Sequence, residues 1–305
     1  MTALVYSLAA YDYLARDMAA LGGYQLGQLD RGIFPDGEHH LRVIDDVNDR
    51  NVVLVGGTVD DSATLELYDL ACAIVECGAA TLTLVVPWFG YATSERAVKP
   101  GEAVIAKTRA RIFSSIPRAK FGNEILLLDL HSEGIPHYFE GSIRPFHVYA
   151  KPLIQATARD LAGGPFVLGS TDAGRAKWVE SLANDLGVPA AFVYKRRLGP
   201  AATEVSAISA NLQGETVVIY DDMIRTGGSL MGAARAYREA GAGRIAAIAT
   251  HGVFPGDALS RINASGLFSA VACTDSHPRA RDLAGEGLRV ESVAALFLPF
   301  LKRMR

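Results

Sequence analysis

The chain has 305 residues, of which 50% are hydrophobic and 21% are charged, and its formal net charge at pH 7 is −3. This length suits one large or two ordinary α/β domains with sizeable cores. The weakly negative charge argues against a broad nucleic-acid footprint, which needs a clustered basic face. The sequence has no basic-then-apolar leader and no apolar run near the ~18 residues of a membrane span. We therefore expect a cytoplasmic protein without a nucleic-acid or membrane partner.

The three cysteines, Cys72, Cys77 and Cys273, are too few and too irregularly spaced for a disulfide framework. Cys72 and Cys77 fall on a helical pattern and Cys273 in an apolar strand. We therefore expect all three to be small core residues in a reducing compartment, without a role in metal binding.

Apolar strand-like runs alternate with helical patterns along the chain. The predicted strands are Ala3–Leu8, Val52–Gly56, Leu82–Val86, Ile125–Leu130, Phe166–Leu168, Ala190–Tyr194, Val217–Tyr220, Ile245–Ala249 and Ala270–Cys273. The predicted helices are Thr64–Glu76, Ala103–Ser115, Ala173–Leu186, Ser229–Ala240 and Ser292–Arg305. Strands that are apolar on both faces and joined by crossover helices form parallel sheets covered on both sides. The predicted fold class is therefore α/β, with two similar doubly wound parallel sheets.

The alternation of strands and helices runs twice, with a seam near His147–Pro152. This predicts a first domain over residues 1–147 and a second domain over residues 148–290. The C-terminal helix, in residues 291–305, is amphipathic with a basic end and is a candidate to pack back on the first domain.

Four predicted strands end in polar residues. Asp129–Ser132 follows one strand and Ser170–Gly174 the next, while Tyr194–Arg197 and Asp221–Ser229 follow two later strands. Ligands of open α/β sheets bind beyond the carboxyl ends of the strands. Because packing alone does not explain four polar ends, we expect them to form a ligand site.

Each polar group also has an ordinary structural interpretation. His131 fits a hydrogen-bonded core histidine, Asp172 a cap for the helix after it, and the Lys195–Arg197 run a solvated charged face. Together, His131 and Asp172 are candidates to hold magnesium directly or through water, although magnesium prefers oxygen ligands. Lys195 and Arg197 alternate along an extended segment, so both point to one side, where two cations suit a transferring phosphoryl group.

The most specific pattern is Val217–Leu230, VVIYDDMIRTGGSL, which predicts a buried strand, a tight turn and a helix N-terminus. Asp221 and Asp222 are expected where the strand ends, within reach of a ribose diol or a phosphate-bound magnesium ion. The glycine and hydroxyl residues that follow suit a phosphate at a helix N-terminus. The segment resembles the phosphoribosyl-binding loop of type I phosphoribosyltransferases and of ribose-phosphate diphosphokinases.

Further stretches resemble the ribose-phosphate diphosphokinase family, in the right order and over essentially the whole chain. Phe34–Glu38 is similar to its short ATP-contacting segment, Asp129–Ser132 to its Asp-Leu-His stretch, and Asp172–Gly174 to its Asp-Ala-Gly. Lys195–Arg197 resembles the Lys-x-Arg at the root of a mobile catalytic loop, expected here to continue through Leu198–Val205. The resemblance implies a fold like that of type I phosphoribosyltransferases.

The sequence departs from the common form of the family in two places. A Tyr-Ala pair is followed by Thr93–Arg96 in place of the usual Arg-Gln contact to ATP. This string, with Ala106–Pro117 and Thr250–Pro255, resembles the divergent class II enzymes known chiefly from plants. Arg225 stands where the family usually has Asp, and its charge either lies near the 5-phosphate or faces solvent. The departures leave donor preference and regulation by phosphate and ADP open.

The resemblance implies transfer of the diphosphoryl group of ATP to O1 of ribose 5-phosphate, giving PRPP and AMP, with Mg2+ as cofactor and a homo-oligomeric assembly. The site residues that it implies are Lys195 and Arg197 for catalysis; Asp221, Asp222, Arg225, Thr226, Gly227, Gly228 and Ser229 for ribose 5-phosphate; Phe34, Asp36, Gly37, Glu38 and Arg96 for ATP; and His131 and Asp172 for the metal. Phe34–Glu38 is the segment expected to reach the ATP site of a neighbouring subunit.

Two alternatives stay open at this stage. A phosphoribosyltransferase that uses PRPP with a base shares the loop but has no need of Lys195 and Arg197 or of the Phe34–Glu38 motif. A non-catalytic regulatory subunit of the family tends to lose active-site residues, and here only Thr93–Arg96 favours that interpretation.

Overall fold

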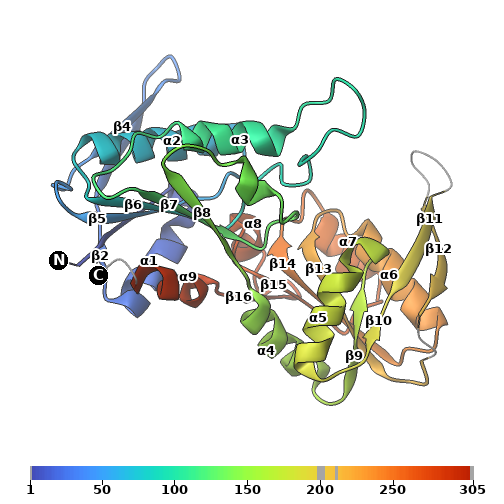
Figure 1. The fold of residues 1–305 in the computed structure, drawn as a ribbon. Helices are drawn as coiled ribbons and strands as arrows, with labels where there is room; N and C mark the ends of the chain where they lie inside the picture. Colours follow the sequence, from blue (N-terminus) through green and yellow to red (C-terminus); the bar gives the residue numbers. More distant parts are fainter. Residues whose placement is uncertain (1, 198–202, 210–211, 303–305) are drawn as a thin grey trace. The chain divides into compact units, whose positions relative to one another are not determined.

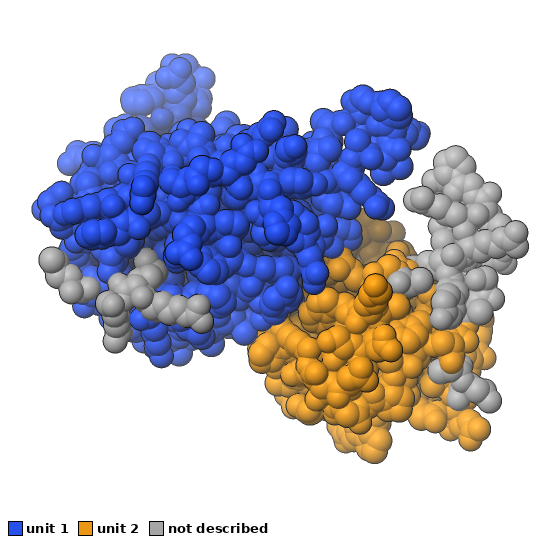
Figure 2. Space-filling model, viewed as in Figure 1, with its two compact units in different colours: residues 1–149, 292–305 blue, residues 150–291 orange. Residues whose placement is uncertain are grey.

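The computed structural model describes residues 2–197, 203–209 and 212–302 of the chain. The chain forms two compact units, Met1–Tyr149 with Ser292–Arg305, and Ala150–Glu291 (Figure 2). Each unit is a parallel sheet with helices on its faces (Figure 1), which confirms the predicted α/β class. None of the helices among the described residues is long and apolar enough to cross a membrane.

The first unit contains a six-stranded sheet in the order β2-β1-β5-β6-β7-β8, with every neighbouring pair parallel. The strands are β1 (Leu4–Ser7), β2 (Gln25–Leu26), β5 (Asn51–Val55), β6 (Thr81–Val86), β7 (Asn123–Leu128) and β8 (Ile143–Val148). The helices are α1 (Asp12–Gly22), α2 (Asp61–Glu76), α3 (Ile105–Ser114) and α9 (Ala294–Leu301), with 3₁₀ turns at Ala9–Tyr11 and Ile135–Tyr138.

One core layer of the first unit lies between the sheet and the helices α2 and α3 (Figure 1). Leu70 and Ile74 of α2 and Phe113 of α3 are fully buried against Leu54 and Leu84 of the strands. Burial of each such side chain stabilises the fold by about 1.5–3 kcal/mol before the entropy cost. α9 packs against α1, so the end of the chain belongs to the first unit.

An antiparallel hairpin of β3 (Leu29–Ile33) and β4 (His39–Val43) projects from the first unit (Figure 1). Phe34–Glu38 forms its tip, where the N–H of Phe34 donates to the carbonyl of Glu38 at 2.8 Å. Gly37 has a φ of +93°, which only glycine adopts without strain. The tip is therefore a tight turn that presents its side chains to solvent.

The second unit contains a six-stranded sheet in the order β10-β9-β13-β14-β15-β16, again with every neighbouring pair parallel. The strands are β9 (Phe166–Ser170), β10 (Ala190–Ala191), β13 (Thr216–Ile224), β14 (Arg244–Gly252), β15 (Ala270–Thr274) and β16 (Leu288–Glu291). The helices are α4 (Lys151–Ala162), α5 (Ala176–Leu186), α6 (Gly228–Glu239), α7 (Ala258–Ala264) and α8 (Pro278–Asp282), with a 3₁₀ turn, η3, at Ala173–Arg175.

The expected strand Ala190–Tyr194 is in fact two elements. Only Ala190 and Ala191 belong to the parallel sheet, and β11 (Val193–Arg197) pairs instead with β12 (Thr203–Ile208) in a separate antiparallel hairpin. The loop expected over Leu198–Val205 is therefore wrong for Thr203–Val205, which belong to β12. The first part of that loop, residues 198–202, lies outside the described residues.

The expectation for the cysteines holds only in part. Cys273 is buried in β15, and burial raises the pKa of its thiol. Cys72 is half-buried and Cys77 is exposed. Cys77 follows the last residue of α2 and is the C-cap of that helix, where its backbone N–H donates to the carbonyl of Ala73. Cys77 is exposed because it lies at the helix end and not on the apolar face of the helix.

Candidate functional site

In the sheet of the second unit, the chain adds strands on one side of β9 and on the opposite side of β13, so the strand order has a switch point between them. From β9 the chain passes through α5 to β10 on one side, and from β13 it passes through α6 to β14 on the other. Doubly wound sheets bind ligands at the carboxyl ends of strands next to such a switch point. Thr171 and Asp172 follow β9, and Asp221 and Asp222 lie in the neighbouring β13.

Asp221 and Asp222 lie inside β13, so the expectation that they stand where the strand ends is wrong. The strand is longer because β14 continues beside it, with Asp221 opposite Ala249 and Ile224 opposite Gly252. Successive side chains of a strand point to opposite faces of the sheet. The Cβ atoms of the two adjacent acids therefore point to different faces, although the carboxyl group of Asp222 still hydrogen-bonds that of Asp221.

Asp221 accepts hydrogen bonds on both carboxylate oxygens. The hydroxyl of Thr171 donates to Oδ2 at 2.9 Å, and the backbone N–H of Asp222 donates to Oδ1 at 3.0 Å. Burial raises the pKa of Asp221 well above its usual range, and the negative charge of Asp222 adds to the rise. The Thr171 hydrogen bond and the charge of Arg175 act in the opposite direction. The site therefore favours the protonated form of Asp221.

Asp222 forms an ion pair with Arg175, through its Oδ2 and a terminal guanidinium nitrogen. The side chains are 7% and 16% exposed respectively, so water screens the pair weakly. Arg175 ends the short turn η3 that follows Asp172. Sequence reasoning missed this arginine because its partner is 47 residues away in the chain.

The Arg225–Ser229 segment joins β13 to α6. Arg225, Thr226, Gly228 and Ser229 are exposed, whereas Gly227 is buried. Gly227 is the N-cap residue of α6 and makes no side-chain cap hydrogen bond, which suits the first N–H groups of the helix to an anion, and the helix dipole adds partial positive charge there. Because Gly227 has a φ of +78° and a Cβ there would lie 2.6 Å from Cδ1 of Ile262, only glycine fits this position.

Tyr237 of α6 fixes the helix to the ends of the neighbouring strands. Its hydroxyl lies 3.0 Å from the backbone nitrogen and the carbonyl oxygen of Ser170 and 2.9 Å from the carbonyl of Ala191. Gly169 makes room for the tyrosine ring, because a Cβ there would lie 2.9 Å from it. The position of α6, and with it the Arg225–Ser229 segment, is thereby set relative to β9.

The other predicted residues of the second unit lie on η3 and β11. Oδ1 of Asp172 accepts the N–H of Gly174 at 2.9 Å, so the capping role weighed from the sequence is present. Lys195 and Arg197 lie on β11, where they pair with Val205 and Thr203 of β12.

His131 belongs to the first unit and follows the carboxyl end of β7. It is half-buried, and the residue before it donates its backbone N–H to Nε2 of His147 at 2.9 Å. Burial lowers the pKa of His147, which favours the neutral ring that this acceptor role requires. His147 is a second functional candidate that sequence reasoning missed.

The predicted ATP residues of the first unit are mostly exposed. Phe34, at the hairpin tip, is 51% exposed and contacts the His40 ring edge-on at 5.9 Å. The Arg96 side chain is 80% exposed and lies 3.6 Å from the carboxylate of Glu95. Both side chains are therefore accessible to a ligand from solvent.

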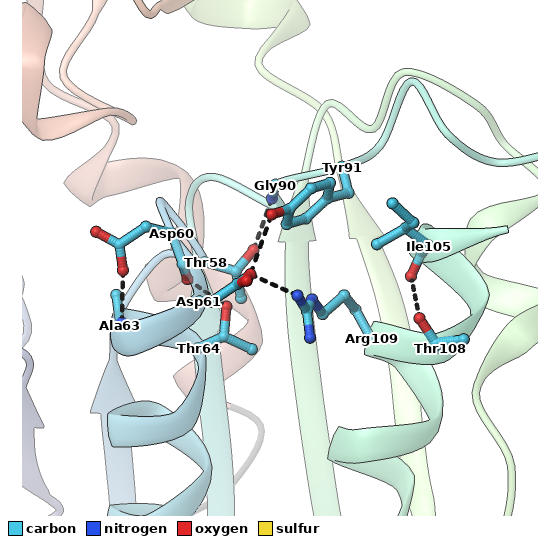
Figure 3. A network of polar contacts seen from close by, with 10 residues as sticks. All are labelled: Thr58, Asp60, Asp61, Ala63, Thr64, Gly90, Tyr91, Ile105, Thr108 and Arg109. Atoms are coloured by element: carbon cyan, nitrogen blue, oxygen red, sulfur yellow. Dashed lines mark hydrogen bonds and ion pairs between the residues drawn. The ribbon is translucent and has the colours of Figure 1, made fainter. Parts of the chain in front are cut away.

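A polar network fixes the backbone that leads to Thr93–Arg96 (Figure 3). Tyr91 has a φ of +59°, an uncommon conformation for a bulky residue. Its hydroxyl donates to Asp61 Oδ1 at 3.0 Å, and Arg109 pairs with the same carboxylate while its guanidinium lies 5.1 Å from the centre of the Tyr91 ring. Gly90 packs so closely on Thr58 that a Cβ there would lie 2.1 Å from the Thr58 carbonyl oxygen.

Among the described residues, no group of three or more histidine, cysteine or acidic side chains is arranged to hold a metal ion. Magnesium is usually bound through one or two carboxylates together with substrate phosphates and water, and seldom by a cage made only of protein. The half-buried carboxylate of Asp172 offers the oxygen chemistry that an ion of that kind needs.

The comparisons with known proteins cover both units. Residues 3–116 match the N-terminal domain of ribose phosphate pyrophosphokinase, and residues 152–271 match the phosphoribosyl transferase domain. A ribose-phosphate pyrophosphokinase of Synechococcus elongatus is 32% identical over 96% of this chain and 87% of its own length. The chain belongs to the ribose-phosphate pyrophosphokinase family. The predicted family and enzyme class are thereby confirmed.

Further relatives agree with this membership. A ribose-phosphate pyrophosphokinase of Bacillus subtilis is 30% identical over 86% of this chain and 81% of its own length. The crystal structure of phosphoribosylpyrophosphate synthetase from Mycobacterium smegmatis matches with a TM-score of 0.87 at 26% identity, covering 100% of this chain and 99% of that chain. A phosphoribosyltransferase alone accounts for the match over residues 152–271 but not for the pyrophosphokinase match over residues 3–116.

Proposed function

We propose that this chain transfers the β,γ-diphosphoryl group of ATP to O1 of ribose 5-phosphate. A bond forms between O1 and the β-phosphorus, the bond from that phosphorus to the oxygen retained by AMP breaks, and the proton of O1 is released. The products are PRPP and AMP. The observation that carries the proposal is the uncapped α6 N-terminus beside Asp221 at the switch point of a pyrophosphokinase-family chain.

We assign the 5-phosphate of ribose 5-phosphate to Arg225–Ser229. The N–H groups at the start of α6 and the hydroxyls of Thr226 and Ser229 donate to its oxygens, and Arg225 supplies a positive charge. Asp221 and Asp222 are the acids beside this segment, with the ribose hydroxyls as their expected partners. This assignment accounts for the buried Gly227 in a segment whose Thr226 and Ser229 are exposed.

We assign ATP to the first unit and catalysis to β11. Phe34, Asp36, Gly37 and Glu38 form an exposed tip suited to reach a neighbouring subunit, and Arg96 is an exposed cation beside the Tyr91 network. A homo-oligomer follows if the tip completes another subunit's site. Lys195 and Arg197 stabilise the charge that develops on the transferring group and on AMP.

Magnesium, bound mainly through the substrate phosphates, neutralises their charge, with Asp172 and His131 as the protein groups that we expect to contact it or its waters. No covalent nucleophile is needed, because positioning and electrostatic stabilisation supply most of the catalysis of such transfers.

The test is a coupled assay for AMP and PRPP from Mg2+, ATP and ribose 5-phosphate. Lys195→Ala should lower kcat by about 100-fold, as loss of one transition-state charge contact does. Arg196→Ala, a neighbouring position without an assigned role, is the matched control. Absence of PRPP from the unaltered chain with ATP, GTP and CTP, with and without phosphate, would overturn the proposal and favour a regulatory subunit.

A further inference from the structure

A small cavity in the first unit is lined by residues that have no role in the proposed reaction. It lies near the carboxyl end of β1, between that strand, α1 and β3, and has a volume of about 160 Å³. We propose that this cavity binds a free α-amino acid with a small apolar side chain. The inference concerns binding alone and is independent of the proposed function.

The cavity lies beside the switch point of its sheet. From β1 the chain passes through α1 to β2 on one side, whereas β5, on the other side of β1, leads through α2 to β6. The switch point is therefore between β1 and β5, and open α/β sheets bind ligands beyond the carboxyl ends of strands at such a point. Ser7, the last residue of β1, is part of the cavity wall.

Three charged side chains line the cavity. Asp12 and Arg16 lie one turn apart on α1, and Arg31 belongs to β3. Asp12 accepts the hydroxyl of Ser7 at 2.7 Å. The guanidinium of Arg31 is fixed, because it donates to the carbonyl of Ser7 and its Nε lies 3.3 Å from Oε1 of Glu66. Within the described part of the chain, Arg16 is exposed and makes neither a hydrogen bond nor an ion pair.

The balance of charge around the cavity favours a zwitterion. Arg16 and Arg31 are positive, whereas Asp12 and the Glu66 partner of Arg31 are negative, so the charges of these groups cancel. A phosphate dianion would leave this set with an excess of negative charge. A zwitterion adds no net charge: its carboxylate pairs with the guanidinium groups, and its ammonium group donates to Asp12.

The size and the apolar wall of the cavity indicate which zwitterion fits. Its volume is several times the ~30 Å³ of one water molecule but below the ~300–1,000 Å³ of sites for drug-sized ligands. The cavity therefore suits a small amino acid and is too small for a nucleotide. Val5, Leu26 and Leu29 form the apolar part of the wall, and Leu26 is 45% exposed. Contact with an apolar ligand side chain removes this surface from water.

The test is titration calorimetry of the full chain with L-valine. L-Valine should bind saturably and raise Tm, because a ligand of the native state stabilises that state. Isovalerate is L-valine without the ammonium group, and isobutylamine is L-valine without the carboxylate. Each should bind about tenfold or more weakly than L-valine, because it leaves a charged group of the cavity without its partner.

Two variants separate the two ends of the ligand. Arg16→Met should weaken L-valine binding about tenfold and should not weaken isobutylamine binding, because only a partner of the carboxylate is lost. Asp12→Asn keeps an acceptor for Ser7 and should weaken L-valine binding by a similar factor, without weakening isovalerate binding. Arg42→Met removes an exposed arginine of β4 that does not line this cavity, so it is the control and should bind L-valine like the unaltered chain.

Three results would overturn the proposal. The first is the absence of saturable binding by L-alanine, L-valine and L-leucine. The second is tighter binding of inorganic phosphate than of L-valine, which would make the cavity an anion site. The third is equal affinity for L-valine in the unaltered chain, Arg16→Met and Asp12→Asn, which would place the amino acid elsewhere. None of these measurements requires PRPP formation, so their outcome is separate from that of the proposed function.

Discussion

The backbone N–H of Leu130 donates a hydrogen bond to Nε2 of His147 at 2.9 Å. Leu130 stands between Asp129, whose φ is +36°, and His131. A non-glycine residue in this region of φ is held there by its surroundings, and such strain is often found at functional sites. The bond to His147 therefore helps to fix the backbone that presents His131.

We predict that His147→Ala lowers the apparent affinity of the enzyme for Mg2+. The variant leaves the Leu130 N–H without its partner, at a cost of about 1–3 kcal/mol, and loosens the segment that carries His131. The Mg2+ concentration for half-maximal PRPP formation should rise several-fold. His137→Ala, at an exposed position of the same unit, is the control. An unchanged Mg2+ titration for His147→Ala would argue against a metal contact at His131.

The two adjacent glycines of the phosphate segment should respond differently to alanine. Gly227→Ala places a side chain at a φ of +78° and 2.6 Å from Ile262, and we expect a loss of about 2–4 kcal/mol in stability from strain and overpacking. At Gly228 the nearest atom to a new Cβ is 3.8 Å away. Gly228→Ala should therefore keep Tm near the value of the unaltered chain, and equal losses of Tm in both variants would contradict the assignment of Gly227.

The sequence predicted both parallel sheets because their strands are nearly continuous apolar runs, which have few other ways to bury both faces. It missed the β3–β4 hairpin, whose strands are largely exposed, although Pro-Asp-Gly at residues 35–37 is a turn signal that was available. It predicted the order strand, turn and helix over Val217–Leu230 correctly but ended β13 too early, because the length of β14 beside it depends on the tertiary fold. The sequence did not single out Arg175 for the same reason, since its ion pair is with Asp222 of β13, which is distant in the chain.

Tyr237→Phe isolates the contribution of one buried hydroxyl to the position of α6. The change leaves the Ser170 N–H and the Ser170 and Ala191 carbonyls without this partner, and we expect a loss of about 1–3 kcal/mol. Tm should fall by several °C, measured by circular dichroism. Tyr149→Phe removes a hydroxyl from a side chain that is 44% exposed and should leave Tm unchanged. A similar Tm for both variants would show that the Tyr237 hydrogen bonds do not fix the helix.

His277 should make the second unit sensitive to acid. It accepts the N–H of Arg279 at Nδ1, 3.1 Å away, and caps α8. Burial, together with the charges of His251 and Arg279, lowers the pKa of His277 to about 4. In the unfolded chain His277 binds a proton below about pH 6.5, whereas in the folded chain it stays neutral down to about pH 4. The free energy of unfolding is therefore unaffected by His277 above about pH 6.5 and falls as the pH drops from there toward pH 4.

His277→Asn keeps a capping acceptor and removes the titration. Between about pH 7.5 and pH 5, the unaltered chain should lose about 2 kcal/mol more of unfolding free energy than the variant, measured by urea unfolding. A parallel loss in both proteins would mean that other carboxylates and histidines account for the acid sensitivity. A smaller loss in the unaltered chain would reverse the sign and show that His277 is stabilised in its protonated form.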